Sequence, residues 1–133
     1  MTIFEDAYPV SERPHVLRVA ILGASGSIGT QALDVCRQHS DRIAVTALSV
    51  FSSTEKLVEA AREFGVSHVA VADPAHGDDA VLTELPKSCE LGIGDNAVSA
   101  LCDLDDVDCV LVAVVGEAGI WACHQALVAG KVV

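Results

Sequence analysis

Hydrophobic residues fall into short runs along the chain, and longer segments of helical period separate these runs. The runs are rich in Val, Ile, Leu and Ala, which is typical of strands that are covered on both faces. We predict strands at Val16 to Leu22, Ile43 to Val50, His68 to Ala72, Cys89 to Ile93, Val107 to Val115 and Lys131 to Val133. The segments between them predict helices at Ser27 to Gln38, Thr54 to Phe64, Ala75 to Leu85, Asn96 to Leu101 and Gly119 to Ala129.

This alternation predicts an α/β fold, namely a Rossmann-type doubly wound parallel sheet with helices on both faces. Each connection between strands is long enough for a right-handed crossover. Some helix ends carry their own signals. Thr54, with Glu55 after it, is expected to cap the start of its helix, and Gly65 and Gly130 are expected to close two others.

A length of 133 residues corresponds to one ordinary domain. Residues 1–15 are polar and rich in turn-forming residues, so we expect a flexible N-terminal extension. Residues 16–133 form the predicted Rossmann domain. Its last predicted strand stops at Val133, just after it opens, and we therefore expect this domain to be incomplete at its C-terminal end.

Composition and charge restrict the possible partners. The formal net charge of −11 argues against nucleic acid and against an anionic membrane surface, because both require a basic binding face. The sequence contains neither a secretory signal nor an apolar run of roughly 20 residues that could span a membrane. We therefore expect a cytoplasmic protein. Because its overall charge is negative, an anionic ligand would have to be bound by a small group of local donors rather than by a basic surface.

Residues that often bind metals are present but poorly arranged for it. The five cysteines contain no C-x-x-C pair, so we expect them to act as small hydrophobic side chains rather than as zinc ligands or disulfides. His68 and His124 have no visible partner and are expected to be packing or surface residues. The acidic group at 103–108 matches no calcium loop and is expected to be a solvated turn. The sequence thus predicts no metal site.

A glycine-rich turn is the main candidate for binding chemistry. It runs from Gly23 to Gly29, directly after the first predicted strand and before the first predicted helix. Free backbone amides and the positive end of the helix dipole would receive a dinucleotide pyrophosphate there. In this pattern Gly23 allows the turn, Gly26 allows close approach of the phosphates, and Gly29 allows tight packing of helix against strand. A tight turn without a ligand is the alternative interpretation.

The remaining cofactor-binding candidates lie at the ends of later strands. Ser25, Ser27 and Ile28 complete the phosphate-binding set, and the two hydroxyls add donors beside the amides. In a Rossmann fold, residues at the end of the second strand contact the adenosine ribose. At that position this chain has Ser52 and Ser53, whose hydroxyls can hydrogen-bond a phosphate but carry no charge.

Phe51, just before these serines, would stack on adenine or fill a gap. Gly116 belongs to a small-residue turn where the nicotinamide half would lie. Glu117 beside it is best explained as an acid in the first turn of a helix, favoured by the dipole, rather than as a catalytic group. We therefore assign no catalytic residue.

The motif Gly23-Ala24-Ser25-Gly26-Ser27-Ile28-Gly29-Thr30-Gln31-Ala32-Leu33-Asp34-Val35 resembles the opening motif of the 1-deoxy-D-xylulose 5-phosphate reductoisomerase family. Three later segments resemble the same family in order and spacing, namely Asp106-Val107-Asp108, Val115-Gly116-Glu117-Ala118-Gly119 and Ala129-Gly130-Lys131. The family usually has Gly, a basic residue and Asn where this chain has Phe51, Ser52 and Ser53. It usually has a small residue in place of Glu117.

The resemblance implies an NADPH-binding domain of an enzyme that isomerises and reduces 1-deoxyxylulose 5-phosphate to 2-C-methylerythritol 4-phosphate, in isoprenoid biosynthesis. It implies contacts from Ser25, Gly26, Ser27 and Ile28 to the cofactor phosphates. It also implies Mg²⁺ or Mn²⁺, a phosphorylated sugar substrate and a homodimer for the full-length enzyme, but the metal ligands and substrate site of the family lie beyond Val133. We therefore expect the chain alone to be inactive.

Two other functions stay open. The departures at Phe51, Ser52 and Glu117 would also suit a stand-alone nucleotide-binding or interaction module that lacks catalysis. A similar glycine turn would suit a domain of another NAD(P)-dependent dehydrogenase, and preference for NADH would favour that alternative.

Overall fold

The computed structural model describes residues 16–133, and the predicted flexible extension at 1–15 lies outside the described residues. Five strands form one sheet: β1 (Leu17–Leu22), β2 (Ile43–Val50), β3 (His68–Val71), β4 (Glu90–Ile93) and β5 (Cys109–Val112). Four α-helices accompany them: α2 (Ser27–Gln38), α3 (Thr54–Phe64), α4 (Asp95–Ala100) and α5 (Glu117–Val128). Short 3-10 helices occur at η2 (Pro74–His76), η3 (Ala80–Glu84) and η4 (Leu101–Asp103).

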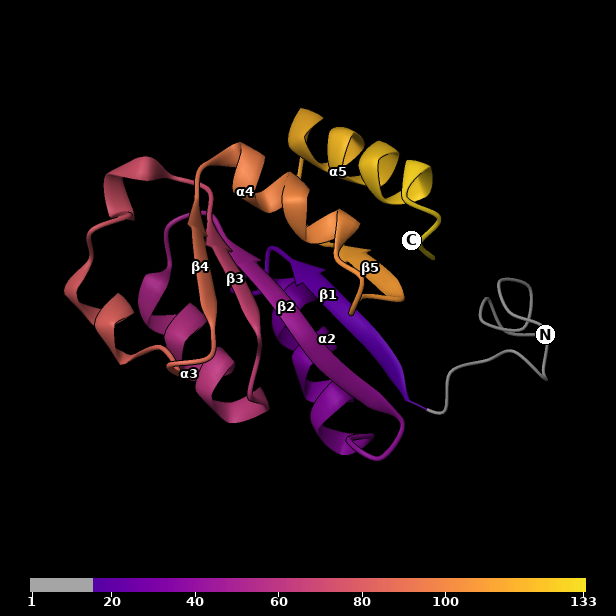
Figure 1. Cartoon of the computed structure of the whole chain (residues 1–133), viewed down its shortest axis with the longest axis horizontal. Helices are drawn as coiled ribbons and strands as arrows, with labels where there is room; N and C mark the ends of the chain where they lie inside the picture. Colours follow the sequence, from indigo (N-terminus) through magenta and orange to yellow (C-terminus); the bar gives the residue numbers. More distant parts are fainter. Residues whose placement is uncertain (1–15) are drawn as a thin grey trace.

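The strands are all parallel and lie in the order β4-β3-β2-β1-β5 (Figure 1). Each of β2, β3 and β4 is added on one side of its predecessor, and the chain then crosses to the opposite side of β1 to form β5. Beyond β5, Val132 makes a single parallel bridge to Cys109. The predicted strand at Lys131 to Val133 is therefore present only as one bridge, beside the strand where a sixth member of the sheet would lie.

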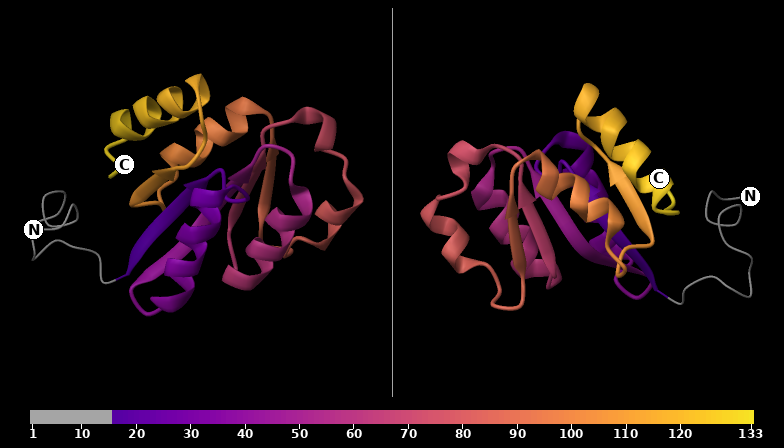
Figure 2. Two further views of the ribbon diagram at one scale, coloured as in Figure 1. Left: turned by 180° about the vertical axis from the view of Figure 1, so that it is seen from behind. Right: turned by 45° about the horizontal axis from the view of Figure 1, so that its top comes forward.

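Helices cover both faces of the sheet, as predicted (Figure 2). Alternate residues of β1 explain how, because Val19 and Ile21 pack with α2 and α3, whereas Ala20 and Leu22 pack with η4 and α5. The first cluster is the larger and contains Leu33, Leu48 and Leu57. Both clusters are built from aliphatic side chains and cysteines, in keeping with an aromatic content of only 4%.

Glycines close two helices as the sequence predicted. Gly65 lies in the left-handed region with φ 63° and ends α3. After α5, Gly130 has φ 77°, its amide donates to Leu127, and the Lys131 amide donates to Ala126. This pair of bonds is a Schellman motif, which satisfies carbonyls that the helix leaves open.

Three local predictions were wrong. The expected helix at Ala75 to Leu85 is replaced by η2 and η3, because Gly77 and two aspartates interrupt the helical run and Pro74 starts a short turn. The start of α3 is capped by position 53, and Thr54 is instead its first residue. The strand expected at Val107 to Val115 is shorter at both ends, since β5 spans only Cys109–Val112.

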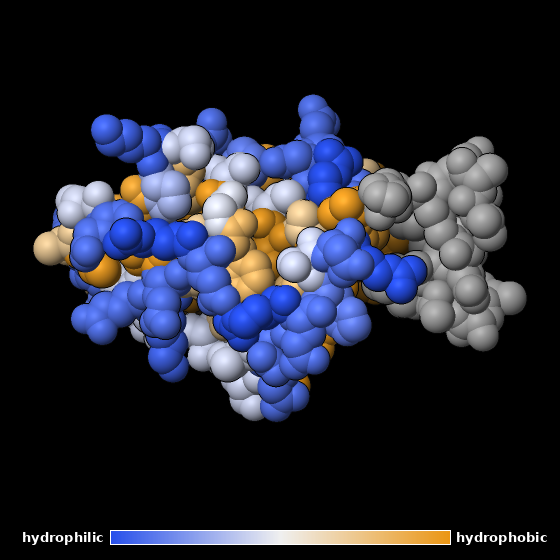
Figure 3. Space-filling model, turned by 90° about the horizontal axis from the view of Figure 1, so that it is seen from below, coloured by the Kyte–Doolittle hydropathy of each residue, from blue (hydrophilic) through white to orange (hydrophobic). Residues whose placement is uncertain are grey.

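Charged side chains pair along the amino-terminal edge of the sheet. Arg18 donates two side-chain hydrogen bonds to Asp108, with Nη2 at 2.8 Å from Oδ1 and Nε at 3.0 Å from Oδ2. His68 lies 3.1 Å from Asp106 through Nε2 and 3.4 Å from Glu90 through Nδ1. His68 therefore has partners that the sequence does not reveal. The predicted turn is present at residues 105–106, with Asp103 and Asp105 exposed, but Asp106 and Asp108 also pair with other segments. Figure 3 shows a face on which hydrophilic residues predominate, with apolar residues visible between them.

Candidate nucleotide-binding site

The carboxyl end of β1 differs from the other strand ends because the order of strand addition reverses there. After β1 the chain adds strands on one side, and after β4 it crosses to the other side, so the direction of winding changes at β1. In open parallel sheets, ligands bind outside the carboxyl ends of the strands at this switch point. The turn that follows β1, Gly23 to Gly26, is the first part of the glycine-rich segment Gly23 to Gly29 that the sequence singled out, and α2 begins within that segment at Ser27.

Neighbouring strands fix the first half of this turn. The carbonyl of Ser49, on β2, accepts hydrogen bonds from the amides of Gly23 at 3.0 Å and Ala24 at 2.8 Å. The Ser49 side chain is buried, and its Oγ also lies 3.2 Å from the Gly23 amide. On the other side, the amide of Ala113 donates to the carbonyl of Leu22 at 2.9 Å. The turn is therefore attached to the strands on both sides of β1.

Two of the three glycines, Gly23 and Gly29, must be glycine because neighbouring backbone atoms leave no room for a Cβ. Gly23 has φ 83°, and a Cβ there would lie 2.8 Å from the carbonyl oxygen of Ala113. A Cβ on Gly29 would lie 2.2 Å from the carbonyl oxygen of Gly23, closer than packed atoms can approach. These two glycines bring helix, turn and neighbouring strand together, as the sequence predicted for the turn and the tight packing.

Gly26 differs, because nothing in the described chain needs it to lack a side chain. Its φ of −77° and ψ of 179° suit any residue. A Cβ would meet only the Gly23 carbonyl oxygen at an ordinary 3.7 Å. Gly26 is exposed on the outer side of the turn, so the space above it is open to a ligand that approaches the backbone closely.

The amino end of α2 presents backbone donors to that space. No hydrogen bond within the described residues engages the amides of Ser25, Ser27, Ile28 and Gly29. No side chain of the described residues caps this end, and Ser27 and Ile28 are exposed. Free amides at the positive end of a helix dipole are a phosphate-binding arrangement.

The turn after β2 lies beside this site and carries Ser52 and Ser53, both partly exposed. Phe51 before them is 67% exposed, so it does not fill a gap in the protein. The next residue, Thr54, is buried, and its Oγ1 donates a hydrogen bond to Asp79 at 2.5 Å. His76 Nδ1 lies 3.0 Å from the same Asp79 oxygen. These hydrogen bonds, from Thr54 first and from His76 second, lower the pKa of the Asp79 carboxyl.

The turn after β5 reaches the other half of the proposed dinucleotide position. Gly116 has φ 78° and precedes α5, whose first residue is Glu117. The Glu117 carboxylate is exposed and accepts a hydrogen bond of 3.4 Å from Trp121 Nε1, one helical turn later. This contact fits the expectation of an acid in the first turn of a helix. His124, the other histidine of interest, lies with its ring centroid 6.2 Å from that of Trp121.

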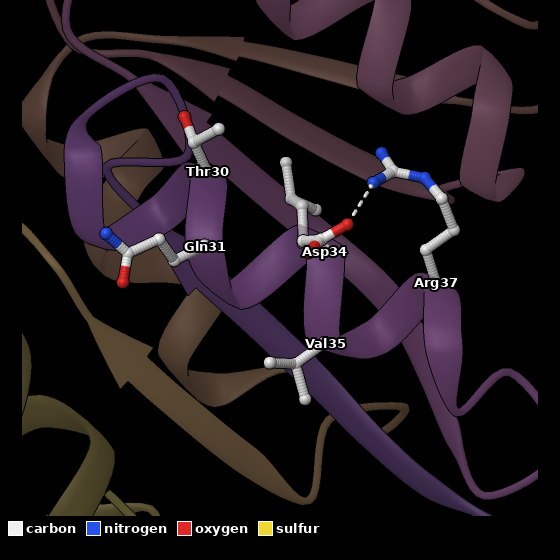
Figure 4. Close-up of a pocket in the computed structure, with 6 residues that line it drawn as sticks. Thr30, Gln31, Asp34, Val35 and Arg37 are labelled. Atoms are coloured by element: carbon white, nitrogen blue, oxygen red, sulfur yellow. Dashed lines mark hydrogen bonds and ion pairs between the residues drawn. The ribbon is translucent and has the colours of Figure 1, made fainter.

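A surface hollow of about 510 Å³ lies elsewhere, along the outer face of α2 (Figure 4). The residues that line it, among them Thr30, Gln31 and Asp34, all come from that one helix. Its charged groups already have partners, because Arg37 binds Asp34 at 3.1 Å and also binds Glu63 of α3. It is therefore distinct from the glycine-rich turn, and its charged side chains are already engaged within the protein.

The described residues contain no alternative metal centre. No group of three or more His, Cys, Asp or Glu side chains within 16–133 could hold a metal ion. The cysteines are free thiols, of which Cys36 and Cys102 are buried, and burial raises the pKa of Cys102 and of Cys109 to about 11. Within the same residues, no helix has the length and apolar character that crossing a membrane requires.

Sequence reasoning missed two contributors to the site. Ser49 is a hydroxyl in the middle of a buried apolar strand, and that contrast was the available signal. The hydrogen bond between Thr54 and Asp79 joins residues 25 positions apart, so no local sequence pattern could predict it.

Comparison with known proteins gives a consistent result. The family model of 1-deoxy-D-xylulose 5-phosphate reductoisomerase matches residues 19–133. The curated reductoisomerase of Thermosynechococcus vestitus is 35% identical over 113 residues, covering 84% of this chain and 27% of that protein. The enzyme of Cupriavidus metallidurans is 38% identical over 116 residues, covering 86% of this chain and 30% of that protein.

Solved structures agree in fold. The reductoisomerase of Zymomonas mobilis in complex with NADPH superposes with a TM-score of 0.80 at 30% identity, covering 87% of this chain and 30% of that one. A reductoisomerase in complex with magnesium gives a TM-score of 0.77 at 32% identity, covering 87% and 29%. The chain thus spans about 30% of the length of these relatives. Because the family model matches residues 19–133, the chain belongs to the 1-deoxy-D-xylulose 5-phosphate reductoisomerase family.

Proposed function

We propose that residues 16–133 form a dinucleotide-binding domain whose ligand is NADPH. The observation that carries this proposal is the amino end of α2, where free amides surround a glycine that the protein's own packing does not require. A solved relative whose structure contains NADPH supports the choice of cofactor. The pyrophosphate would bind at Gly23, Ser25, Gly26, Ser27, Ile28 and Gly29.

The two ends of the cofactor would then follow the sheet edge in opposite directions. The adenosine ribose and its 2′-phosphate would lie toward Ser52 and Ser53, whose hydroxyls can donate hydrogen bonds. The nicotinamide would lie toward Gly116, because that turn follows β5 on the other side of β1. NADPH supplies a hydride when bound, and the residues described here would bind and orient it.

We propose that the complete enzymatic function is that of the family, the NADPH-dependent conversion of 1-deoxyxylulose 5-phosphate to 2-C-methylerythritol 4-phosphate in the cytoplasm. It would involve a phosphorylated sugar, a divalent metal and a homodimer. The described residues contain no metal centre, so the metal and the chemical step would rely on parts of the relatives that this chain does not match. The 133-residue chain alone is expected to bind NADPH without turnover.

Calorimetric titration of the chain with NADPH tests the binding proposal. Gly26→Ala should keep the fold, because its Cβ has room, yet weaken NADPH binding by about tenfold or more, since the methyl group would occupy the phosphate position. Ser40→Ala, an exposed change at the far end of α2, is the control and should leave binding unchanged.

Four results would contradict parts of this proposal. Equal NADPH binding by the Gly26 variant would remove the phosphate assignment. A preference for NADH would favour another dehydrogenase, and binding of neither nucleotide would favour an interaction module. Turnover of the sugar phosphate by the chain alone would contradict the separation of binding from chemistry.

A further inference from the structure

A single buried hydroxyl lies next to the glycine-rich turn. Ser49 is 2% exposed, and its register partners in the sheet are Leu22 of β1 and Ala70 of β3. Both partners belong to the apolar cluster that packs with η4 and α5. A hydroxyl in such surroundings loses its contact with water, so its burial is unfavourable unless the oxygen is hydrogen-bonded within the protein.

An irregularity in the sheet brings this hydroxyl to the turn. The pairing of β1 with β2 shifts by one residue between Val19 and Ala20, so that Leu22 pairs with Ser49. Without the shift, Leu22 would pair with Leu48, and an apolar side chain would replace the hydroxyl at this position. Irregularities of this kind re-aim a side chain, and they are frequent next to functional sites.

Ser49 binds the first two amides of the turn in two ways. Its carbonyl oxygen accepts hydrogen bonds from the amides of Gly23 and Ala24, as the carbonyl of any residue at this position could. Its hydroxyl oxygen is a second acceptor for the Gly23 amide, at 3.2 Å. The Gly23 amide is thus shared between two oxygens of one residue, and only the side-chain bond requires serine.

The carbonyl of Gly23 in turn contacts the start of α2. It accepts a hydrogen bond of 3.3 Å from the Gly26 amide, and a Cβ on Gly29 would lie only 2.2 Å from it. A displacement of Gly23 would therefore shift the amides of Ser27 and Gly29, which no hydrogen bond among residues 16–133 engages. Groups that bind a ligand must be held within about 0.5 Å of the productive geometry, so such a shift would weaken binding.

We propose that Ser49 is a positioning residue of the cofactor site. Its hydroxyl fixes Gly23 and thereby aligns the free amides at the start of α2 with the pyrophosphate. Ser49 is buried, so it acts through Gly23 and does not itself touch the cofactor. Because NADPH and NADH carry the same pyrophosphate, its effect is equal for both nucleotides. This inference rests on the proposed dinucleotide site.

The experiment measures calorimetric binding of NADPH and of NADH to the full chain, at a temperature where urea unfolding shows each variant to be folded. Ser49→Ala removes one hydrogen bond and should lower the affinity for both nucleotides by about two- to tenfold. The ratio of the two affinities should not change. Ile43→Val is the matched control, because it weakens packing at the opposite end of the same strand, and it should bind like the wild type.

Two further measurements separate positioning from stability. Ser49→Thr restores the hydroxyl but adds a methyl group at a buried site, so it should be no more stable than Ser49→Ala and yet bind NADPH more tightly. Nitrogen-15 NMR of the unliganded proteins reports the amides directly. In Ser49→Ala the amide resonances of Ser27, Ile28 and Gly29 should be displaced, whereas Ile43→Val should leave them in place.

A role of Ser49 in stability alone predicts a different pattern. Equal NADPH affinity in the wild type and Ser49→Ala would overturn the inference, although the proposed function would survive. Equal losses of affinity in Ser49→Ala and Ile43→Val would also overturn it, and so would weaker binding without displaced amide resonances. If Ser49→Thr does not fold, the other two variants decide. Absence of binding of either nucleotide by the wild type would overturn the proposed function and this inference together.

Discussion

At the scale of single residues, the three glycines of the turn have different physical reasons to be glycine. Gly29 and Gly23 are fixed by backbone atoms of the protein, which cannot move away from an added Cβ as a flexible side chain could. Gly26 has neither a crowded Cβ position nor an unusual backbone. The separation matters because it assigns two glycines to folding and leaves the third for the ligand.

The first residue-scale prediction concerns Gly29→Ala. The new Cβ would lie 2.2 Å from the Gly23 carbonyl oxygen, so helix and turn must separate. We expect the free energy of unfolding to fall by about 3 kcal/mol, as for severe overpacking. Urea unfolding followed by circular dichroism measures this change. Gly26→Ala is the matched control and should cost at most about 1 kcal/mol, and equal losses would contradict the division of roles.

At the scale of elements, the ends of the helices are determined by local backbone chemistry. The end of α3 illustrates this, since Gly65 has φ 63° and its Cβ position is empty within 4 Å. A side chain there would meet no neighbour, and the only cost would come from the left-handed backbone.

Gly65→Ala should therefore lower the free energy of unfolding by about 1 kcal/mol. Gly65→Asn should cost less, because asparagine tolerates the left-handed region. Thermal and urea unfolding of the two variants give the comparison. An alanine variant as stable as the wild type would contradict the assignment of this helix end.

Most elements could be predicted from the sequence because their signals are local. The helices at 27–38 and 54–64 begin and end where the pattern of apolar residues indicated. The segment at 75–85 could not be predicted correctly, because its apolar residues suit a helix while Gly77 and the neighbouring aspartates favour short turns. The glycine-rich site follows from adjacent residues. Ser49 contacts Gly23 from 26 positions away and Asp79 contacts Thr54 from 25 positions away, so neither contact leaves a local pattern in the sequence.

At the scale of the whole molecule, the two edges of the parallel sheet carry different chemistry. The carboxyl edge presents free amides and glycines, and the amino edge holds charged pairs between distant segments. Arg18 and Asp108 join the beginning of β1 to the approach to β5, across 90 positions of sequence. Their pairing therefore stabilises the overall arrangement of strands rather than any one element.

This pairing predicts a defined acid response. Burial alone would raise the pKa of Asp108, but the hydrogen bonds from Arg18 outweigh it and lower that pKa. A lowered pKa in the folded state contributes stability above the unfolded value of about 3.9, and this contribution is lost as the pH falls through the folded value.

Asp108→Asn should thus be less stable than the wild type by about 1 kcal/mol at neutral pH, a figure reduced for the exposure of Arg18. The difference should shrink below about pH 4. Urea unfolding of both proteins across this range measures it. A difference that stays constant into acid would show that the charge of Asp108 does not contribute.

The contact of Gly29 with the Gly23 carbonyl also bears on how a ligand is received. The backbone of Gly29 packs directly against the carbonyl oxygen of Gly23, so the shape of the turn depends little on side-chain rotamers. Binding of a phosphate would then sacrifice little conformational entropy, and more of the gross interaction would be retained as affinity. The turn is therefore preorganised, because Gly23 and Gly29 lack the Cβ atoms that would keep its backbone segments apart.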